Sequence, residues 1–335
     1  MNKEIKIQHG SGGSLTSKLV QNIFYKHFNN PYLLEAHDSA RLPGVHGRLA
    51  FTTDSYVINP LQFPGGNIGK LAVCGTVNDL AMSGARPLYI SCGFIIEAGF
   101  SMELLEEIVR SMAETAKEAG VIVVTGDTKV VEKGNADKLF INTSGIGEIP
   151  AGIEICGQNA RPGDAVIVSG TLGDHGIAVM LQRQQLQFQS SVKSDCAPLN
   201  GLVSDMLKEC PGIHVLRDAT RGGLATILNE IASQSQVGIE LAGSEIPVKE
   251  EVQGICEVLG LDPLYLANEG KLLAVVPEDK LQNVMRVMHA HPYGRDAKVI
   301  GRIVDKPEGK VFVKSAIGGR RIVDVMTGDP LPRIC

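Results

Sequence analysis

The chain of 335 residues ends in a thiol, because its last seven residues read DPLPRIC and finish at Cys335. The two prolines of this segment remove backbone donors and favour an extended backbone, so we expect neither a helix nor a central strand there. A terminal cysteine is poorly placed to fill a core, but it can carry a covalently bound group between active sites. We therefore predict a flexible tail, residues 319–335, with Cys335 as its reactive group. The alternative is a frayed end that finishes in cysteine by chance.

Five carboxylates have an unusual local setting. Two follow expected strands, in TTDS and TGDTK; one lies in RDATRGG, one in HDSA, and one within an otherwise apolar helix. Each alone could be a turn former or a helix cap. A charged carboxylate in an apolar helix is costly unless it is paired or bound to a cation, and carboxylates are the hard ligands of Mg²⁺. Together they predict a magnesium-dependent nucleotide site with the ligands Asp38, Asp54, Asp79, Asp127 and Asp218.

Glycine-rich segments are the candidates for phosphate binding. No G-x-x-x-x-G-K-[ST] loop occurs, and no G-x-G-x-x-G follows a strand, so neither a P-loop nor a Rossmann site is predicted. The segment HGSGG could direct backbone N–H groups at anionic oxygens and fold over a ligand as a lid, although such runs are also common in linkers. The segment DATRGG falls at an expected helix start, where an anion is favoured. The candidate residues are Gly10, Ser11, Gly12, Gly13, Thr220, Arg221, Gly222 and Gly223.

Composition excludes several classes of protein. The net charge of −5 and the lack of a basic cluster argue against a nucleic-acid partner. No apolar stretch approaches the ~20 residues that cross a bilayer, and no apolar signal core follows the first residues. The seven cysteines form no C-x-x-C pair, so we expect neither a disulfide framework nor a zinc site. We predict a cytoplasmic protein without a membrane partner, in which Cys74, Cys92, Cys156 and Cys256 are buried.

Strands and helices alternate in the first half of the chain. We expect strands at 48–53, 87–95 and 121–125, and helices at 71–82 and 101–119, the latter between an N-cap at Ser101 and a stop at Gly120. A segment rich in Gly and Pro near 150–163 predicts a domain boundary. In the second half we expect strands at 165–169, 272–276 and 299–304, and helices near 175–187, 198–209, 222–233 and 278–289. The predicted parts are a segment with a glycine-rich lid (1–35), a nucleotide-binding domain (36–150), an α/β domain (151–318) and the tail (319–335).

Six segments distributed over nearly the whole chain carry a resemblance: HGSGG (9–13), GTVNDLAMSGARP (75–87), TGDTKVV (125–131), DATRGGLA (218–225), NEGK (268–271) and PRIC (332–335). Together they resemble the ATP-binding superfamily of aminoimidazole ribonucleotide synthetase, selenophosphate synthetase and thiamine-monophosphate kinase. Within it they are most similar to the carbamoyl dehydratases of hydrogenase maturation. The resemblance implies an α+β fold of two domains, with ATP and Mg²⁺ as cofactors. It also implies a homodimer in which two N-terminal sheets pair into a central barrel.

The resemblance also implies roles for individual residues. It places the five carboxylates at Mg²⁺ and the ATP phosphates, and adds Asn78 and Thr128 to the ATP-binding residues. Lys129 and Glu269 would position the reacting group and transfer its proton. Relatives often carry two consecutive acidic residues where this chain has His37 before Asp38, which reduces the expected negative charge at the metal.

The implied reaction uses the terminal thiol. A partner carbamoyltransferase loads Cys335 as a thiocarbamate, ATP phosphorylates the carbamoyl oxygen, and removal of the nitrogen protons leaves S-cyanocysteine. The cyanide then passes through iron-carrying scaffold proteins to a [NiFe]-hydrogenase centre. One alternative is a small-molecule kinase or synthetase of the same superfamily, which would keep full turnover without Cys335. A second is a non-catalytic thiol carrier, which would hydrolyse no nucleotide.

Overall fold

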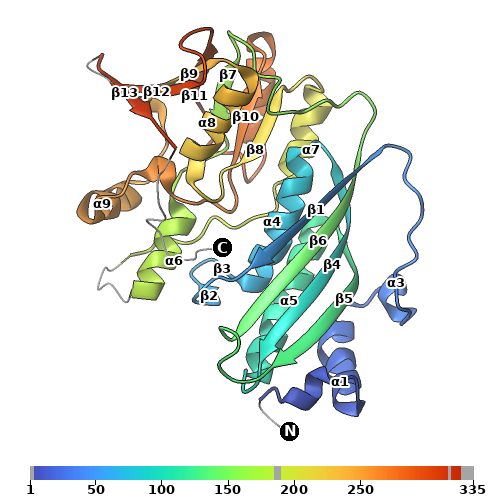
Figure 1. Cartoon of the computed structure of the whole chain (residues 1–335). Coiled ribbons are helices and arrows are strands. Elements are labelled where there is room, and N and C mark those ends of the chain that lie inside the picture. The colour runs from blue at the N-terminus through green and yellow to red at the C-terminus, as the bar shows by residue number, and fades with distance from the viewer. Residues whose placement is uncertain (1–3, 185–189, 316–317, 326–335) are drawn as a thin grey trace.

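The computed structural model describes residues 4–184, 190–315 and 318–325. Two units, each a sheet with helices, lie side by side (Figure 1). The first contains a four-stranded sheet and the second a seven-stranded sheet. This arrangement confirms the predicted two-domain α+β fold. No helix within the described ranges is both long enough and apolar enough to cross a membrane.

The N-terminal sheet has the strand order β1-β6-β4-β5, in which only β4 and β5 run parallel. Its strands are β1 (Arg48–Tyr56), β6 (Leu139–Ile149), β4 (Arg86–Glu97) and β5 (Ile122–Val131). Helices α4 (Ile68–Met82) and α5 (Met102–Ala119) cover one face and bury an apolar core there. Asn67 and Ser101 accept backbone hydrogen bonds at the starts of these helices, and Gly120 ends α5 with φ 69°.

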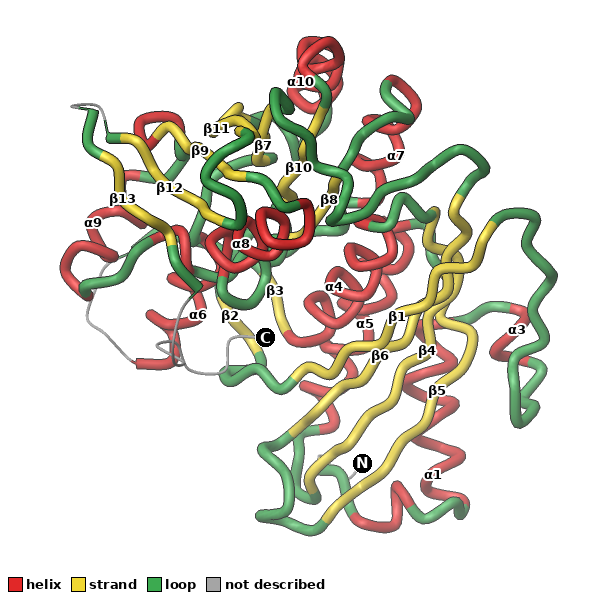
Figure 2. The backbone as a smooth tube through the Cα atoms, turned by 45° about the horizontal axis from the view of Figure 1, so that its top comes forward, coloured by secondary structure: helices red, strands yellow, loops and turns green. Residues whose placement is uncertain are grey.

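The opposite face of this sheet is open in the described part of the chain (Figure 2). It carries large apolar side chains: Leu49 is 65 % exposed, Phe51 69 % and Ile95 44 %. The strands β1 and β5 form the two edges of the sheet. An exposed apolar sheet face between two edge strands is a surface that a second protein surface normally covers.

The chain before β1 forms a helical segment beside the outer edge of the sheet. Its elements are η1 (Ile7–Gly10), α1 (Ser14–Leu19), the π-helical η2 (Val20–Tyr25), α2 (Lys26–Phe28) and α3 (Pro31–Leu34). The ring of Phe24 packs on Phe94 of β4, with 4.9 Å between centroids. The Asn30 side chain donates to the carbonyl of Val123 in β5 at 2.8 Å. These contacts fix the segment against β4 and β5. A short ribbon, β2 (Gln62–Phe63) and β3 (Gly66–Asn67), precedes α4.

The C-terminal sheet has the order β13-β12-β9-β11-β7-β10-β8. Its strands are β7 (Ala165–Val168), β8 (Val215–Asp218), β9 (Gly238–Ala242), β10 (Leu272–Val276), β11 (Lys298–Val304), β12 (Lys310–Lys314) and β13 (Arg320–Val323). The longer helices are α6 (Asp174–Gln184), α7 (Asn200–Glu209), α8 (Gly223–Ser235), α9 (Glu250–Leu259) and α10 (Leu281–Ala290). The short helices are η3 (Gly243–Glu245), η4 (Pro263–Tyr265) and η5 (Glu278–Lys280). Helix α8 packs on one face of the sheet, whereas α7 and α10 pack on the other.

Helix α4 joins the two domains. Its end, Ala81 and Met82, is buried in the same core as α7 and α10 of the C-terminal domain. Residues of α6 and α9, such as Ile177 and Val252, belong to the core of the N-terminal domain. The domains therefore share apolar contacts on both sides of α4, which fixes the segments that meet at their junction.

Several sequence expectations need correction. Asp54 and Asp127 lie inside β1 and β5, not after them, because both strands continue as alternating polar residues beyond their apolar starts. Residues 320–323, expected in the flexible tail, form β13, and Val323 is fully buried. Cys156 is exposed, although its neighbours suggested burial. The helix expected at 278–289 begins with one short 3₁₀ turn before α10. The remaining expected strands and helices are confirmed, with ends that shift by a few residues; positions 185–187 of the helix expected near 175–187 lie outside the described residues.

Candidate active site

An acidic pair lies between β1 and α4. Alternation along β1 directs Asp54 toward the helix, where it meets Asp79. Burial, followed by the charge of Asp79, raises the pKa of Asp54 to about 6. Thr52 donates a hydrogen bond to Asp79 at 2.8 Å and fixes its orientation. Two carboxylates held this close favour a bound cation or a shared proton.

Asp218 extends this pair into the C-terminal domain. It ends β8, and burial together with the charge of Asp79 raises its pKa to about 7, against the opposing effect of Arg217. The positive charge of Arg221 lowers the pKa of Asp54, so the guanidinium also faces the group. We call Asp54, Asp79, Asp218 and Arg221 the junction cluster.

The glycines after Asp218 adopt a conformation that other residues disfavour. Gly222 and Gly223 have φ of 73° and 61°, and a Cβ on Gly223 would lie 2.5 Å from the carbonyl oxygen of Leu264. Helix α8 starts here, and its first amides lie next to Arg221. The predicted residues Thr220 to Gly223 therefore do lie at a helix start, beside the junction cluster, where an anion is stabilised.

Glu269 is buried beside the same cluster. It is 3 % exposed, and its Oε1 has no hydrogen-bond partner among the described residues. Burial raises its pKa well above the usual value, and the charges of Cys196 and Asp218 add to the shift. The backbone N–H of Glu269 donates to Asp195 at 3.0 Å. A buried carboxyl with a raised pKa is suited to accept a proton near neutral pH.

Asn78 holds the junction together. Its Nδ2 donates to the carbonyls of Ala197 at 3.1 Å and Glu269 at 3.4 Å, and its Oδ1 accepts from the N–H of Leu199 at 2.7 Å. Asn78 is 1 % exposed. Its amide is fully used by the protein, so in this structure it positions Glu269.

A second group of predicted residues lies at the outer edge of β5. Lys129 Nζ lies 2.8 Å from Asp127 Oδ2 and lowers the pKa of that carboxyl, as does the N–H of Thr128. Gly10 packs directly on this strand, since a Cβ there would lie 2.5 Å from the nitrogen of Val130. Ser11, Gly12 and Gly13 are exposed beside it, before α1. We call Asp127, Thr128, Lys129 and the 10–13 loop the edge group. Asp38 is exposed in the segment after α3.

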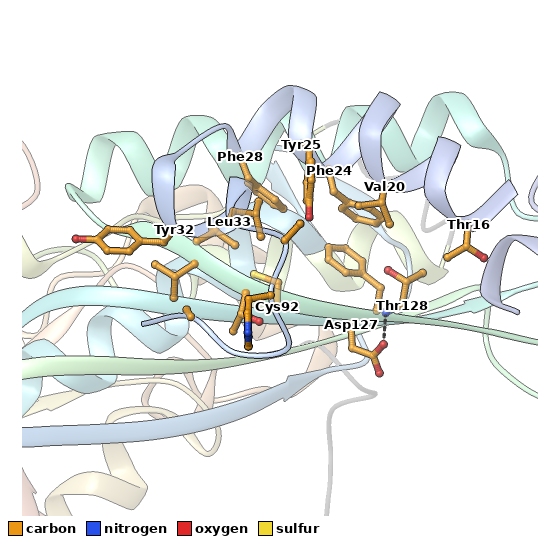
Figure 3. Close-up of a pocket in the computed structure, with 18 residues that line it drawn as sticks. Thr16, Val20, Phe24, Tyr25, Phe28, Tyr32, Leu33, Cys92, Asp127 and Thr128 are labelled. Carbon is orange, nitrogen blue, oxygen red and sulfur yellow. Dashed lines mark hydrogen bonds between the residues drawn. The ribbon is translucent and has the colours of Figure 1, made fainter. Parts of the chain in front are cut away.

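An aromatic pocket adjoins the edge group. Its volume is about 270 Å³, and it lies between the N-terminal helical segment and strands β4 and β5 (Figure 3). Phe24, Tyr25, Phe28 and Tyr32 form one wall, and Asp127 and Thr128 lie at its border. A flat apolar ring with a charged extension would fit such a pocket.

The junction cluster and the Asp127–Lys129 ion pair of the edge group lie on opposite faces of the N-terminal sheet. Across the strands, Asp127 is in register with Gly93, Asn142 and Ser55, and the exposed side chains of Asn142 and Ser55 point to the open face. Asp54 neighbours Thr143, which bonds to α4 on the other face. Within the described residues, no three acidic, His or Cys groups come close enough to hold a metal. A single chain thus gathers the predicted site residues in two separate sets.

Comparison with known proteins decides the family. The N-terminal domain model of AIR synthase related proteins matches residues 36–149, and the C-terminal domain model of the same family matches residues 161–314. Carbamoyl dehydratase HypE of Rhizobium leguminosarum bv. viciae is 51 % identical, over 100 % of this chain and 96 % of its own. The Escherichia coli K12 protein of that name is 50 % identical, over 99 % of each chain. The chain belongs to the HypE family.

Solved structures agree with this assignment. A HypE crystal structure in complex with ATP superposes with a TM-score of 0.95 at 49 % identity, covering 98 % of this chain and 99 % of that one. A HypE–HypF complex gives 0.82 at 50 % identity, covering 94 % and 100 %. AaThiL complexed with AMPPCP and TMP, at 21 % identity and a TM-score of 0.65 over 90 % of this chain and 95 % of that one, shares the fold alone. The resemblance inferred from the six motifs is therefore confirmed at the level of the HypE family.

The sequence did not reveal every residue of the site. The aromatic wall of the pocket comes from η2, α2 and α3 before the first domain, where no motif marks it. Asp195, which fixes the backbone of Glu269, lies in an irregular segment whose SDCAPL sequence gave no pattern to read. Cys335 lies outside the described residues.

Proposed function

We propose that this HypE chain is an ATP-dependent carbamoyl dehydratase that converts an S-carbamoyl group on its own Cys335 into S-cyanocysteine. The observation that carries the proposal is a buried carboxyl, Glu269, beside an acidic cluster, whose Oε1 has no hydrogen-bond partner among the described residues, in a chain of the carbamoyl dehydratase family that carries Cys335 in its PRIC motif. Cyanide from this thiol would supply the iron ligand of a [NiFe]-hydrogenase centre. The protein would act in the cytoplasm, and would receive the carbamoyl group from a carbamoyltransferase. The solved complex of a related HypE with HypF supports such a partner. Iron-carrying scaffold proteins would accept the cyanide.

ATP fits the two groups of residues. The aromatic pocket of about 270 Å³ suits the adenine ring, and the exposed 10–13 loop beside it can cover the phosphates as a lid. The helix start at Gly222 and the guanidinium of Arg221 suit the terminal phosphate. The relative solved with ATP supports nucleotide binding by this family.

Magnesium fits the acidic residues. The charge of Asp79 raises the pKa of both Asp54 and Asp218, so a bound cation would stabilise the ionised form of these carboxylates. Asp38, Asp54, Asp79, Asp127 and Asp218 would hold Mg²⁺, with Asp127 and Asp38 arriving from the other set of residues. Bound Mg²⁺ would neutralise the phosphate charge and orient the terminal phosphoryl group.

A homodimer would unite the two sets. The open sheet face with Phe51 and Ile95 needs a cover, and a two-fold barrel of two such sheets would place the β1 edge of one subunit beside the β5 edge of its partner. Each barrel seam would then combine the junction cluster of one chain with the edge group of the other. Two composite ATP sites per dimer would result.

The proposed reaction balances without a further reactant. The carbamoyl oxygen attacks the γ-phosphorus, and the bond to the ADP oxygen breaks. The first nitrogen proton leaves as the O-phosphorylated imidate forms. Glu269, with Lys129 as a positioning charge, takes the second nitrogen proton while the C–O bond to phosphate breaks and C≡N forms. The products are S-cyanocysteine, ADP, phosphate and a proton.

Intact-mass analysis tests the proposal. With a competent carbamoyl donor system, we expect one carbamoyl group on Cys335, followed by loss of one water only when ATP and Mg²⁺ are present. Cys335→Ala should gain no adduct, whereas Cys156→Ser, which removes an exposed thiol elsewhere, should behave as wild type. A wild-type adduct that never loses water would refute the dehydratase.

A further inference from the structure

The position of the proposed base, Glu269, depends on its main-chain contacts. Its Oε1 has no hydrogen-bond partner among the described residues, although the residue is buried. An oxygen without a donor is free to accept a proton from the substrate, but no hydrogen bond then holds that oxygen in place. The contacts of the peptide groups on either side of Glu269 therefore have to direct its carboxyl group toward the reacting nitrogen.

Both domains hold these peptide groups. The N–H of Glu269 donates to Oδ1 of Asp195 at 3.0 Å. The carbonyl oxygen of Glu269 accepts from Nδ2 of Asn78 and from the N–H of Ala197, each at 3.4 Å. Asn78 belongs to α4, whereas Asp195 and Ala197 belong to the segment between α6 and α7. The bond to Asp195 is the shortest of the three, so it is the contact best able to fix the base.

The chain that precedes Glu269 is anchored to the rest of the C-terminal domain. The hydroxyl of Tyr265 donates to the carbonyl of Asp324 at 2.9 Å. The N–H of Asn268 donates to the carbonyl of Ala219 at 2.9 Å. The bond from Glu269 to Asp195 continues this series of contacts, which would otherwise end one residue before the base.

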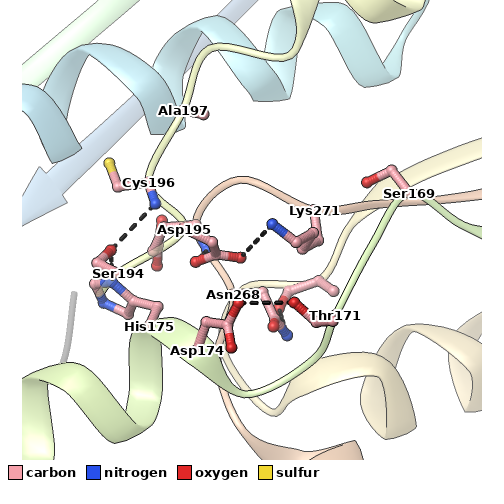
Figure 4. Close-up of polar contacts among 12 residues, drawn as sticks. Ser169, Thr171, Asp174, His175, Ser194, Asp195, Cys196, Ala197, Asn268 and Lys271 are labelled. Atoms are coloured by element: carbon pink, nitrogen blue, oxygen red, sulfur yellow. Dashed lines mark hydrogen bonds and ion pairs between the residues drawn. The ribbon is translucent and has the colours of Figure 1, made fainter. Parts of the chain in front are cut away.

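The segment that carries Asp195 is itself fixed (Figure 4). The N–H of Ser194 donates to the carbonyl of Pro64 at 2.7 Å, and its Oγ accepts from the N–H of Cys196 at 3.1 Å. Nδ1 of His175 lies 2.8 Å from the same Oγ. These contacts attach the residues on both sides of Asp195 to the turn between β2 and β3 and to α6.

A glycine allows the two segments to touch through their backbones. A Cβ on Gly270 would lie 1.9 Å from the carbonyl oxygen of Asp195 and 3.0 Å from the nitrogen of Ala197. Such a close approach is open only to a residue without a side chain. The base is thus followed directly by a residue that is packed on the segment of Asp195.

Asp195 accepts this hydrogen bond as a buried, charged group. Its side chain is 2 % exposed, and Nζ of Lys271 lies 3.5 Å from its Oδ2 (Figure 4). The ammonium group offsets the cost of burying the carboxylate. A hydrogen bond to an ionised acceptor is roughly twice as strong as one between neutral groups. Lys271 therefore strengthens the hold of Asp195 on Glu269.

We propose that Asp195 is a positioning residue of the dehydratase, whose carboxylate holds the main chain of Glu269 so that the free Glu269 oxygen meets the thiocarbamate nitrogen. This inference rests on the proposed function and adds a residue that sets its rate. Asp195 acts through Glu269, and Lys271 acts through Asp195. A base that is displaced by about 1 Å can lose about a hundredfold in rate, so one buried hydrogen bond is enough to matter.

Two substitutions of Asp195 separate positioning from stability. Asp195→Asn keeps an oxygen that can accept from the N–H of Glu269 but loses the charge, whereas Asp195→Ala loses both. The rate of ATP-dependent water loss from the carbamoylated chain is timed by intact mass at several ATP concentrations. The melting temperature of each variant is measured alongside.

Asp164→Ala is the matched control. Asp164 is also a buried carboxylate that accepts from a backbone N–H, that of Arg161 at 2.8 Å, and pairs with a basic side chain, His214 at 2.7 Å. It precedes β7, whereas Ser169, which bonds to Leu272 beside the Glu269 segment, follows that strand. Asp164→Ala therefore removes equivalent contacts at the other end of β7.

We expect Asp195→Ala to lower the maximal rate at least about tenfold, with less than about a twofold change in the ATP concentration that gives half of it. Asp195→Asn should stay within about threefold of wild type, because the acceptor oxygen remains. Asp164→Ala should lower the melting temperature but change the maximal rate less than about twofold.

Lys271→Met provides a second test that does not need Asp195→Ala to fold. It should slow the wild-type chain about threefold but have little effect on Asp195→Asn, since the amide has no charge to offset. An equal effect on both chains would exclude a role of Lys271 through Asp195.

A maximal rate of Asp195→Ala close to that of wild type would overturn the positioning role and leave the dehydratase intact. Equal slowing by Asp195→Ala and Asp164→Ala would also overturn it, because general destabilisation would then be responsible. A loss in Asp195→Asn as large as in Asp195→Ala would exclude the acceptor oxygen as the cause. Failure of the wild-type chain to lose water would instead refute the proposed function.

Discussion

The separation of the site residues over two sheet faces predicts complementation between inactive subunits. Asp79→Asn removes a junction carboxylate, and Asp127→Asn removes an edge carboxylate. If each site takes its junction cluster from one chain and its edge group from the other, either variant alone has two defective sites per dimer. In a mixed dimer both substitutions meet in one site, and the other site is wild type.

The expected recovery follows from counting sites. Random exchange of equal amounts gives half mixed dimers, each with one intact site of two, so about 25 % of wild-type ATP-dependent dehydration should return. The variants are produced with different affinity tags, mixed under mild dissociating conditions, and assayed by intact mass on Cys335. Each variant exchanged with itself is the control. A mixture as inactive as its components, with mixed dimers present by tag pull-down, would show that one chain builds the whole site.

Three further predictions concern the pH dependence of stability, the backbone conformation of Gly223 and the hydrogen bonds of Asn78. Since burial raises the folded-state pKa of Asp218 to about 7, its stabilising contribution is present below the unfolded value of 3.8 and is lost as pH rises through about 7. In EDTA, the melting temperature of wild type should therefore fall relative to Asp218→Asn between these values, and a pH-independent difference would contradict the shift. Gly223→Ala should cost about 3 kcal/mol or more in chemical denaturation, because its Cβ meets a carbonyl oxygen at 2.5 Å. Gly120→Ala, at similar φ in open space, should cost only about 1–2 kcal/mol; equal costs would exclude the clash as the cause. Asn78→Ala removes three hydrogen bonds to buried backbone groups, of which the Leu199 N–H and the Ala197 carbonyl lose their side-chain partner, and should cost roughly 3 kcal/mol, against less than about 1 kcal/mol for the exposed Asn142→Ala.

Local signals explain what the sequence could predict. Ser101 and Gly120 mark the ends of α5 because an N-cap oxygen and a left-handed glycine act within one turn. The apolar run before Asp79 likewise predicts a buried helix, in which a carboxylate needs a partner or a cation. The structure places Asp54 and Asp218 beside Asp79. Such features depend on neighbours in the chain, so they can be read without the fold.

Long-range pairing explains what the sequence could not predict. Strands β1 and β5 continue through polar residues because one of their faces is open, and only the register with β6 and β4 shows to which side Asp54 and Asp127 point. The same motif pattern would suit a site within one chain or a site between two. Asp195 contacts Glu269, and the aromatic pocket wall adjoins Asp127, through tertiary packing alone. No spacing of residues in the sequence therefore predicts either contact.

The hydrogen bond between Tyr265 and Asp324 has a consequence for any protein that exchanges groups with Cys335. Eleven residues follow Asp324, so the sulfur can travel at most about 36–40 Å from that fixed point. A donor or acceptor enzyme must therefore bring its own reactive centre inside that radius. A partner with a deeply buried active site would have to bind with the entrance of that site facing the Tyr265 side of this domain. Binding elsewhere would leave the sulfur of Cys335 out of range.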